Sequence, residues 1–207
     1  AAPGRFRFAD IDGVGPDGKL TGQPDGKIDA ADRTYLGSPV PKFTGGLNLR
    51  FTYKNFDVET YAYTSLGNKI FNVSKWFTDF FPSFEGAAIS ARVRDSWSPQ
   101  NTGATMPIYE RASNFSTNTQ SNSYYVEDGS YFRLQNLSIG YTLPVAVASK
   151  VGLQRARVFV STNNLFTITK YQGLDPAVGG NADTNFGIDV GNYPVTRQFV
   201  GGISIGF

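Results

Sequence analysis

Hydrophobic and polar residues alternate along five segments of the chain, which is the period of a β-strand. In the first segment, residues 43–53, the side chains of Phe43, Leu47 and Phe51 share one face, and polar residues share the other. The remaining segments are residues 56–66, 131–143, 156–166 and 197–207. Each is at least as long as the roughly 9 to 11 residues that a tilted strand needs to cross an outer membrane. The alternation therefore predicts an all-β chain with transmembrane strands.

The last predicted strand ends on an aromatic residue. Its hydrophobic face consists of Phe199, Ile203, Ile205 and Phe207. An edge strand of a soluble sheet would show the same alternation. A terminal phenylalanine, however, resembles the C-terminal signal by which outer-membrane barrels are recognised for insertion. These four residues are therefore interpreted as a signal for the barrel assembly machinery.

Two local features refine the strand assignment. The pair Lys54-Asn55 separates the first two segments and predicts a tight hairpin. In the third segment the hydrophobic phase changes between Leu134 and Leu137. A β-bulge near Gln135-Asn136 would absorb that change, because a bulge inserts one extra residue into a strand.

The connections between the predicted strands alternate between short and long, as in outer-membrane barrels. This alternation puts the C-terminus in the periplasm and the long connections outside the cell, with Tyr53, Phe56, Tyr141 and Phe207 in a periplasmic aromatic girdle. The predicted regions are an extracellular loop at 1–42, a hairpin at 43–66, a long extracellular loop with a short helix at 67–130, and C-terminal strands at 131–207 that include an extracellular loop at 167–196.

Composition agrees with a membrane β-protein and argues against several other classes. Hydrophobic residues make up 40% of the chain and aromatic residues 14%, and 23 Gly with 11 Pro indicate many turns. No segment approaches the roughly 18 to 20 apolar residues of a membrane helix. A net charge of +2 without a basic patch argues against nucleic acid. The absence of histidine removes the usual general base, so we do not expect an enzyme.

Five strands cannot form a complete barrel. Closed bacterial barrels have at least about eight strands, and lipid does not tolerate an open sheet edge. The chain also begins at Ala1 without a recognisable signal peptide. We therefore expect it to be a segment of a larger exported protein.

Several sequence motifs resemble those near the end of SusC/RagA-type TonB-dependent outer-membrane transporters. The motifs are residues 37–49 (GSPVPKFTGGLNL), 53–57 (YKNFD), 128–144 (DGSYFRLQNLSIGYTLP), 157–171 (RVFVSTNNLFTITKY), 173–176 (GLDP) and 187–194 (GIDVGNYP). The resemblance implies the last quarter or less of a plugged, antiparallel barrel of about 22 strands. It further implies a Gram-negative, Bacteroidetes-like outer membrane, and a plug and TonB-contacting segment in the N-terminal part of the protein, outside this chain.

The same resemblance implies import of glycans or peptides, with a SusD-like surface lipoprotein as a lid. The alternative is a structural or adhesive barrel segment without a transport role of its own. Arg50, Asp57 and Glu59 lie on the inward phase, where they would line a substrate path or pair with the plug. A third and least favoured function is hydrolysis of a glycan by a carboxylate pair such as Asp57 and Glu59, because the sequence does not fix the distance between the two carboxyl groups. The sequence does not name the substrate.

An acidic segment near the N-terminus is a candidate calcium loop. The carboxylates are those of Asp10, Asp12, Asp25, Asp29 and Asp32, and glycine follows Asp12 and Asp25, as in loops that bind hard cations through carboxylates. Residues 14–24 interrupt the motif of the resembling family. A solvated turn held by Asx hydrogen bonds is the equal alternative.

Trp76 lies in a segment, residues 75–81, with aromatic residues at helical spacing. Its indole could stack on a sugar, because aromatic faces are common carbohydrate platforms. The favoured alternative is a loop helix that packs its apolar side onto the barrel.

Overall fold

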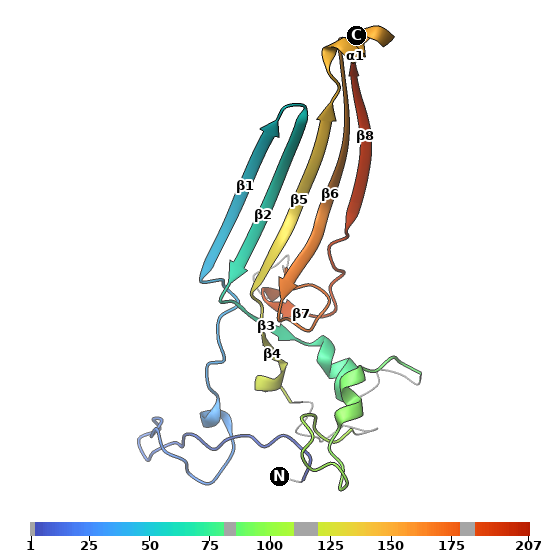
Figure 1. Cartoon of the computed structure of the whole chain (residues 1–207). Coiled ribbons are helices and arrows are strands. Elements are labelled where there is room, and N and C mark those ends of the chain that lie inside the picture. The colour runs from blue at the N-terminus through green and yellow to red at the C-terminus, as the bar shows by residue number, and fades with distance from the viewer. Residues whose placement is uncertain (1–2, 81–85, 110–119, 179–184) are drawn as a thin grey trace. The chain divides into compact units, whose positions relative to one another are not determined.

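The computed structural model describes residues 3–80, 86–109, 120–178 and 185–207, so parts of both long connections, and the last residue of the 75–81 segment, lie outside the described residues. Its largest element is an antiparallel sheet in the order β1-β2-β5-β6-β8 (Figure 1). These strands are β1 (Phe43–Tyr53), β2 (Phe56–Leu66), β5 (Tyr131–Thr142), β6 (Arg155–Thr169) and β8 (Gln198–Gly206). The five strands predicted from the alternation are thus confirmed.

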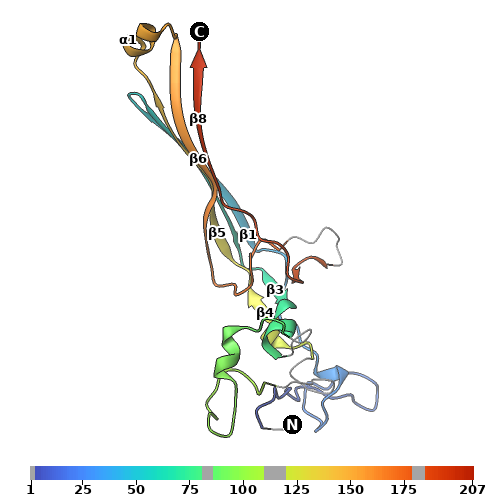
Figure 2. The ribbon, with the colours of Figure 1, turned by 90° about the vertical axis from the view of Figure 1, so that its right-hand side faces the viewer.

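The sheet has one hydrophobic and one polar face. Residues directly opposite in antiparallel strands point to the same face, and Val158 of β6 lies opposite both Tyr141 of β5 and Ile203 of β8. Large side chains on this face stay exposed, with 64% of Phe51 and 71% of Ile203 accessible. Figure 2 shows the sheet from the side, with the twist of an ordinary β-sheet. Such a two-faced sheet is typical of a barrel wall.

Two irregularities occur where the sequence predicts them. Leu134 and Asn136 of β5 pair with both neighbouring strands, whereas Gln135 is skipped on each side. The β-bulge expected at this place is therefore present. In the hairpin between β1 and β2, Lys54 adopts a left-handed backbone conformation with a φ of 53°, which closes the turn.

The sheet is open in the part of the chain that the structure describes. β1 and β8 stand at the two ends of the strand order, so each has one neighbour in this sheet. The antiparallel arrangement with two unpaired edges is that of a partial barrel. Across the described ranges, no helix is both long and apolar enough to cross a membrane.

The long connections contain secondary structure of their own. Within 67–130 and 167–196, which the sequence treats as loops, lie β3 (Lys69–Asn72), β4 (Val126–Asp128) and β7 (Ile188–Asp189), which form a second sheet in the order β4-β3-β7. Short helices complete the described elements: η1 (Ala30–Asp32), η2 (Trp76–Phe80), η3 (Ala91–Asp95), η5 (Ser123–Tyr125), α1 (Val145–Ala148) and η6 (Ser149–Val151). The helix expected in the first long connection is η2, a single π-helical turn.

Contacts divide the chain into two compact units. Unit 1 comprises residues 1–37 and 72–126, and unit 2 comprises residues 38–71 and 127–207, which include the five-stranded sheet. The N-terminal segment and most of the first long connection therefore fold together, although the sequence suggests two separate loops. The core of unit 1 is aromatic: Phe80 and Tyr125 are each 2% exposed, and the ring of Phe6 lies 5.7 Å from that of Phe80.

Candidate functional site

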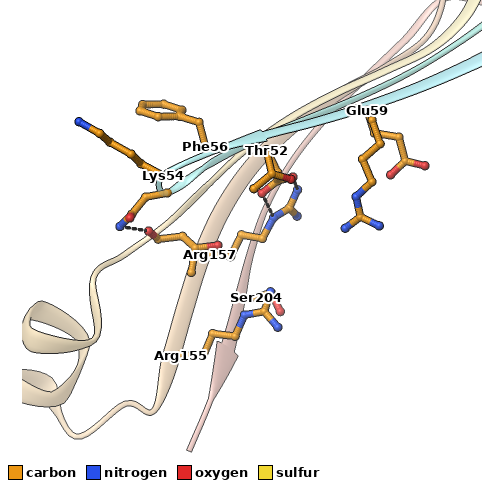
Figure 3. Close-up of a pocket in the computed structure, with 11 residues that line it drawn as sticks. Thr52, Lys54, Phe56, Glu59, Arg155, Arg157 and Ser204 are labelled. Carbon is orange, nitrogen blue, oxygen red and sulfur yellow. Dashed lines mark hydrogen bonds and ion pairs between the residues drawn. The ribbon is translucent and has the colours of Figure 1, made fainter.

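The polar face of the sheet forms a charged pocket beside the β1–β2 turn (Figure 3). Arg50, Asp57 and Glu59, which the sequence assigns to the inward face, all line it. The other lining residues are Thr52, Lys54, Asn55, Phe56, Thr142, Arg155, Arg157 and Ser204. Four cationic and two acidic side chains thus share this surface. A lining of this kind suits non-covalent binding of charged and polar groups.

An ion pair between β6 and β2 crosses the pocket. The guanidinium of Arg157 donates from Nε to Asp57 Oδ1 at 2.9 Å and from Nη2 to Asp57 Oδ2 at 2.5 Å. Such two-point geometry is the strongest form of an arginine–carboxylate contact. The two side chains keep 21% and 22% of their area accessible, so water still screens the charges. This pair connects residues 100 positions apart in the chain.

The ion pair depends on a glycine in the strand between its partners. β5 lies between β2 and β6, and Gly140 of β5 is paired with Asp57. A Cβ atom at Gly140 would lie 2.2 Å from Nη2 of Arg157, so the guanidinium rests directly on the bare glycine backbone. The sequence puts Arg157 on the polar phase of its strand, but the alternation does not reveal its partner. Arg155, Arg157 and Ser204 were therefore missed as site residues.

Residues of the family-like motifs hold the second long connection to the end of the sheet. Arg133 of β5 is 3% exposed, and its guanidinium donates to Thr167 Oγ1 at 2.8 Å and to Asp175 Oδ1 at 2.6 Å. The second oxygen of Asp175 accepts the backbone N–H of Val195 at 3.1 Å. Asp175, from the motif at 173–176, thus links both ends of this connection to β5.

A second contact in the same connection is buried. The hydroxyl of Tyr171 donates to Asp189, and Asp189 also accepts the backbone N–H groups of Gly191 and Asn192 at 2.8 and 3.1 Å. Tyr171 and Asp189 are 6% and 2% exposed. Burial, followed by the bond to Asp189, raises the pKa of Tyr171 well above its usual value. The phenol therefore stays protonated and available as a donor.

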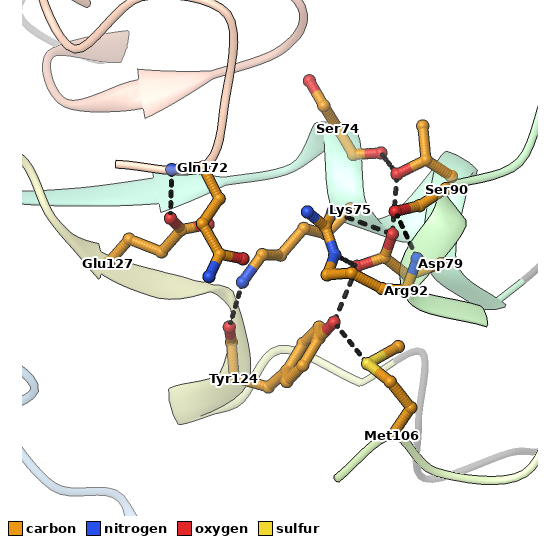
Figure 4. A network of polar contacts seen from close by, with 10 residues as sticks. Ser74, Lys75, Asp79, Ser90, Arg92, Met106, Tyr124, Glu127 and Gln172 are labelled. Carbon is orange, nitrogen blue, oxygen red and sulfur yellow. Dashed lines mark hydrogen bonds and ion pairs between the residues drawn. The ribbon is translucent and has the colours of Figure 1, made fainter. Parts of the chain in front are cut away.

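Unit 1 contains a polar network around Asp79 (Figure 4). Arg92 donates to this buried carboxylate at 2.9 and 3.2 Å, and the hydroxyls of Tyr124 and Thr78 donate to it at 2.6 and 3.0 Å. The ammonium of Lys75 lies 4.3 Å from the ring centroid of Tyr124 and donates to its backbone carbonyl. A buried charge that is paired and hydrogen-bonded in this way joins η2 to η3 and to Tyr124. We interpret the network as structural.

Trp76 belongs to unit 1 and does not lie in the pocket of unit 2. Its indole is half-buried and makes an edge-to-face contact with Phe77 at 4.7 Å. On the same helical turn, Phe80 packs into the aromatic core of unit 1. The apolar side of this helix is therefore used within its own unit, and the sugar-stacking role of Trp76 stays a prediction.

The five aspartates of the acidic segment act as acceptors for backbone N–H groups. Asp10 accepts from residues 25 and 26, and Asp12 accepts from residues 13 and 22. Asp32 accepts from residues 11, 12 and 29, while Asp25 and Asp29 each cap a local turn. In the described ranges, no three Asp or Glu side chains are grouped as a metal site. The bonds of Asp25 and Asp29 are those of Asx turns, and Asp10, Asp12 and Asp32 also accept from backbone groups far along the segment. Calcium binding stays a prediction.

These hydrogen bonds affect ionisation. The N–H group of Gly22 is the main cause that lowers the pKa of Asp12, and the N–H group of Asp29 is the main cause that lowers the pKa of Asp32. Hydrogen bonds to a carboxylate favour its charged form. The backbone contacts of Asp12 and Asp32 are therefore made by ionised side chains at neutral pH.

Three of the four residues of the predicted assembly signal lie on the hydrophobic face. Phe199, Ile203 and Ile205 pair with Thr162, Val158 and Ala156 of β6. Phe207 follows β8 and is 82% exposed. Beside the same end of the sheet, the rings of Phe56 and Tyr141 lie 4.7 Å apart. Of the aromatic residues expected in one girdle, Tyr53, Phe56 and Tyr141 thus share one rung beside the β1–β2 turn, whereas Phe207 follows the last strand at the other edge of the sheet.

Comparisons with known sequences identify one class of protein. No family model matches the chain. The TonB-dependent receptor P3 of Formosa agariphila is 39% identical over 99% of this chain, which covers 19% of that receptor. The TonB-dependent receptor SusC of Bacteroides thetaiotaomicron is 27% identical over 88% of this chain, which covers 17% of that receptor.

Solved structures agree. The RagAB peptide importer in its closed-closed state matches 94% of this chain with a TM-score of 0.72 and 26% identity, over 20% of that importer chain. The open-open state matches with a TM-score of 0.70. The chain spans about a fifth of the length of the relatives it matches. It therefore belongs to the SusC/RagA-type TonB-dependent receptors, of which it represents a segment.

Proposed function

We propose that this chain forms part of the barrel wall of a TonB-dependent outer-membrane importer of glycans or peptides. The observation that carries the proposal is the two-faced sheet, whose exposed hydrophobic face suits lipid and whose charged face suits a water-filled lumen. The relatives are named as receptors and an importer, which supports uptake rather than catalysis. The structural or adhesive alternative would use the same wall without transport.

The proposed orientation follows from the connections. The β1–β2 turn and the connection that contains α1 and η6 would face the periplasm, and the two long connections would face outward. A SusD-like lipoprotein would then close the outward side, as the resemblance of the sequence motifs to SusC/RagA-type transporters implies. TonB would act through a part of the receptor outside this chain.

Two adjacent positions of β6 test the assignment of the faces. In the receptor that carries this chain, Val160→Lys puts a charge on the hydrophobic face, whereas Ser161→Lys puts the same charge on the polar face. A cation on the lipid side of a barrel costs about 2–4 kcal/mol near the bilayer midplane. We expect Val160→Lys to reduce heat-modifiable, folded receptor in outer membranes and Ser161→Lys to leave it unchanged. Equal tolerance of both changes would contradict the membrane wall.

Uptake separates the importer from the adhesive alternative. Deletion of the receptor gene should abolish growth on one glycan or peptide source, and deletion of tonB should have the same effect. Co-purification of a surface lipoprotein with the receptor would identify the lid. Normal growth of the deletion strain on all glycan and peptide sources that support the wild type would favour the structural or adhesive role.

A further inference from the structure

One level of the polar face carries uncharged hydrogen-bonding side chains on every strand. The register pairs Asn48 of β1 with Tyr61 of β2, Tyr61 with Asn136 of β5, Asn136 with Asn163 of β6, and Asn163 with Gln198 of β8. Residues paired in this way point to the same face. We call these five residues the amide belt. Asn48 and Gln198 are exposed and the other three are half-buried, so solvent reaches the belt.

Three of the belt residues are connected by hydrogen bonds. Asn136 Nδ2 donates to Asn163 Oδ1 at 3.1 Å, and Asn163 Nδ2 donates to Gln198 Oε1 at 3.3 Å. Each carboxamide has two N–H donors and an oxygen with two lone pairs. These two bonds use half of the hydrogen-bonding capacity of Asn163. The belt therefore combines fixed side-chain positions with remaining donors and acceptors that can bind a ligand.

The glycine opposite Tyr63 also shapes the belt. A Cβ atom at Gly46 would lie 2.6 Å from the hydroxyl of Tyr61, so the phenol extends over the bare backbone of β1. Tyr61 therefore adds an aromatic surface and a hydroxyl beside Asn48. Aromatic rings with adjacent amides match the apolar and hydroxyl-bearing sides of a sugar.

The absence of charge in the belt contrasts with the next level. Arg50 and Glu59 form the neighbouring rung, whereas the belt consists of four carboxamides and one phenol. The belt offers a charged ligand no side chain of opposite charge. A neutral chain with many hydroxyl groups would gain hydrogen bonds, because a hydroxyl both donates and accepts.

The spacing of the belt favours sugars over peptides. Neighbouring strands lie about 4.7–4.9 Å apart, so the side chains repeat at that interval across the sheet. An extended peptide advances about 3.2–3.4 Å per residue and loses step with this repeat within two residues. One pyranose unit of an extended glycan has a length close to the strand spacing. We propose that the amide belt is a binding site for a neutral glycan that lies across the strands. This inference rests on the proposed role as an importer.

Binding measurements on the full-length receptor test the site. The probes are neutral hexasaccharides (malto-, cello-, laminari-, manno- and xylohexaose) and a capped Gly-Ser hexapeptide, titrated by calorimetry. At least one hexasaccharide should bind the wild type. Asn163→Ala should weaken that binding about 5- to 30-fold, since one to two hydrogen bonds of about 1 kcal/mol are lost. Tyr61→Phe, which keeps the ring, should weaken it about 2- to 10-fold for one hydrogen bond.

Ser161→Ala is the matched control. Ser161 lies on the same face of β6, one rung from Asn163, and should leave the affinity within about twofold of the wild type because its small side chain is outside the belt. Heat-modifiable migration shows that each variant is folded. If Asn163→Ala does not fold, the hexasaccharide affinity of Tyr61→Phe alone tests the site.

Three results would overturn the site. These are no hexasaccharide binding by the wild type, equal binding by the wild type and the belt variants, or loss of peptide binding instead of sugar binding in the belt variants. TonB-dependent uptake is measured in parallel. If the belt variants keep both uptake and sugar affinity, the proposed glycan site is wrong but the importer function is not. If the wild type shows no uptake, the proposed importer function itself is wrong.

Discussion

Gly140→Ala should weaken the ion pair between β2 and β6. A Cβ atom at this position would meet Arg157 Nη2 at 2.2 Å, so the guanidinium must move away from the strand that it crosses. Asp57 would then lose the two donors that reach it at 2.9 and 2.5 Å. The substitution adds one methyl group and changes no charge. Its effect on folding therefore reports the contact between Arg157 and Asp57.

The expected magnitude follows from exposure and geometry. Exposed ion pairs contribute about 0.2–1 kcal/mol, and two-point arginine–carboxylate contacts lie at the upper end. With about a fifth of each side chain accessible, we expect a loss of about 1 kcal/mol for the pair. Alanine in place of a strand glycine by itself stabilises the folded state by about 0.5–1 kcal/mol. The two effects nearly cancel, so the comparison needs a control glycine.

Gly201→Ala supplies this control. Gly201 lies in β8 on the hydrophobic face, opposite Val160, and a Cβ atom there would have no neighbour within 4 Å. Gly201→Ala should therefore be stabilised only by the reduced backbone freedom of the unfolded chain, without any effect on an ion pair. We expect the free energy of unfolding of Gly140→Ala to be about 1 kcal/mol below that of Gly201→Ala.

Urea unfolding of the receptor in detergent, followed by tryptophan fluorescence, measures this difference. A double variant, Gly140→Ala with Arg157→Gln, should be no less stable than Arg157→Gln, because the pair is already lost. High salt should reduce the difference between the two glycine variants, because ions screen an accessible pair. Equal stability of Gly140→Ala and Gly201→Ala, or additive effects in the double variant, would refute the reasoning.

Four further predictions concern other parts of the chain. Phe207→Asp should lower the amount of receptor in outer membranes. A normal amount would contradict the hypothesis that the terminal aromatic residue is a signal for assembly. If the acidic segment binds calcium, hydrogen exchange there should be slower in calcium than in chelator, and Asp29→Asn with Asp32→Asn should abolish the difference; no difference in the wild type would leave the Asx-turn structure. The pKa values of Asp12 and Asp32 are lowered, so these carboxylates stabilise the fold fully above the ordinary carboxyl pKa. This stabilisation is lost as the pH falls through the lowered pKa values. Hydrogen exchange in the acidic segment should therefore become faster only in strong acid. Tyr171→Phe should loosen the connection after β6 by about 1–3 kcal/mol, seen as faster proteolysis, since a buried carboxylate loses a donor; unchanged proteolysis would contradict this.

The strands and their faces were determined by the sequence alone. A strand has a period of two residues, so the face of each side chain follows from local alternation without knowledge of its neighbours. The segment 43–53 matches β1 at both ends, and the phase change near Gln135 located the bulge. The inward positions of Arg50, Asp57 and Glu59 follow for the same reason.

Pairing between distant segments was decided only by the tertiary structure. Alternation gives the face of a residue but not the strand beside it, and a change of register by two residues would keep every face while exchanging every partner. The contact of Arg157 with Asp57 across Gly140, the amide belt, and the union of residues 1–37 with 72–126 all depend on that choice. The aspartates of the acidic segment show the same limit, because only the folded path of the chain determines whether a carboxylate meets a backbone N–H or a cation.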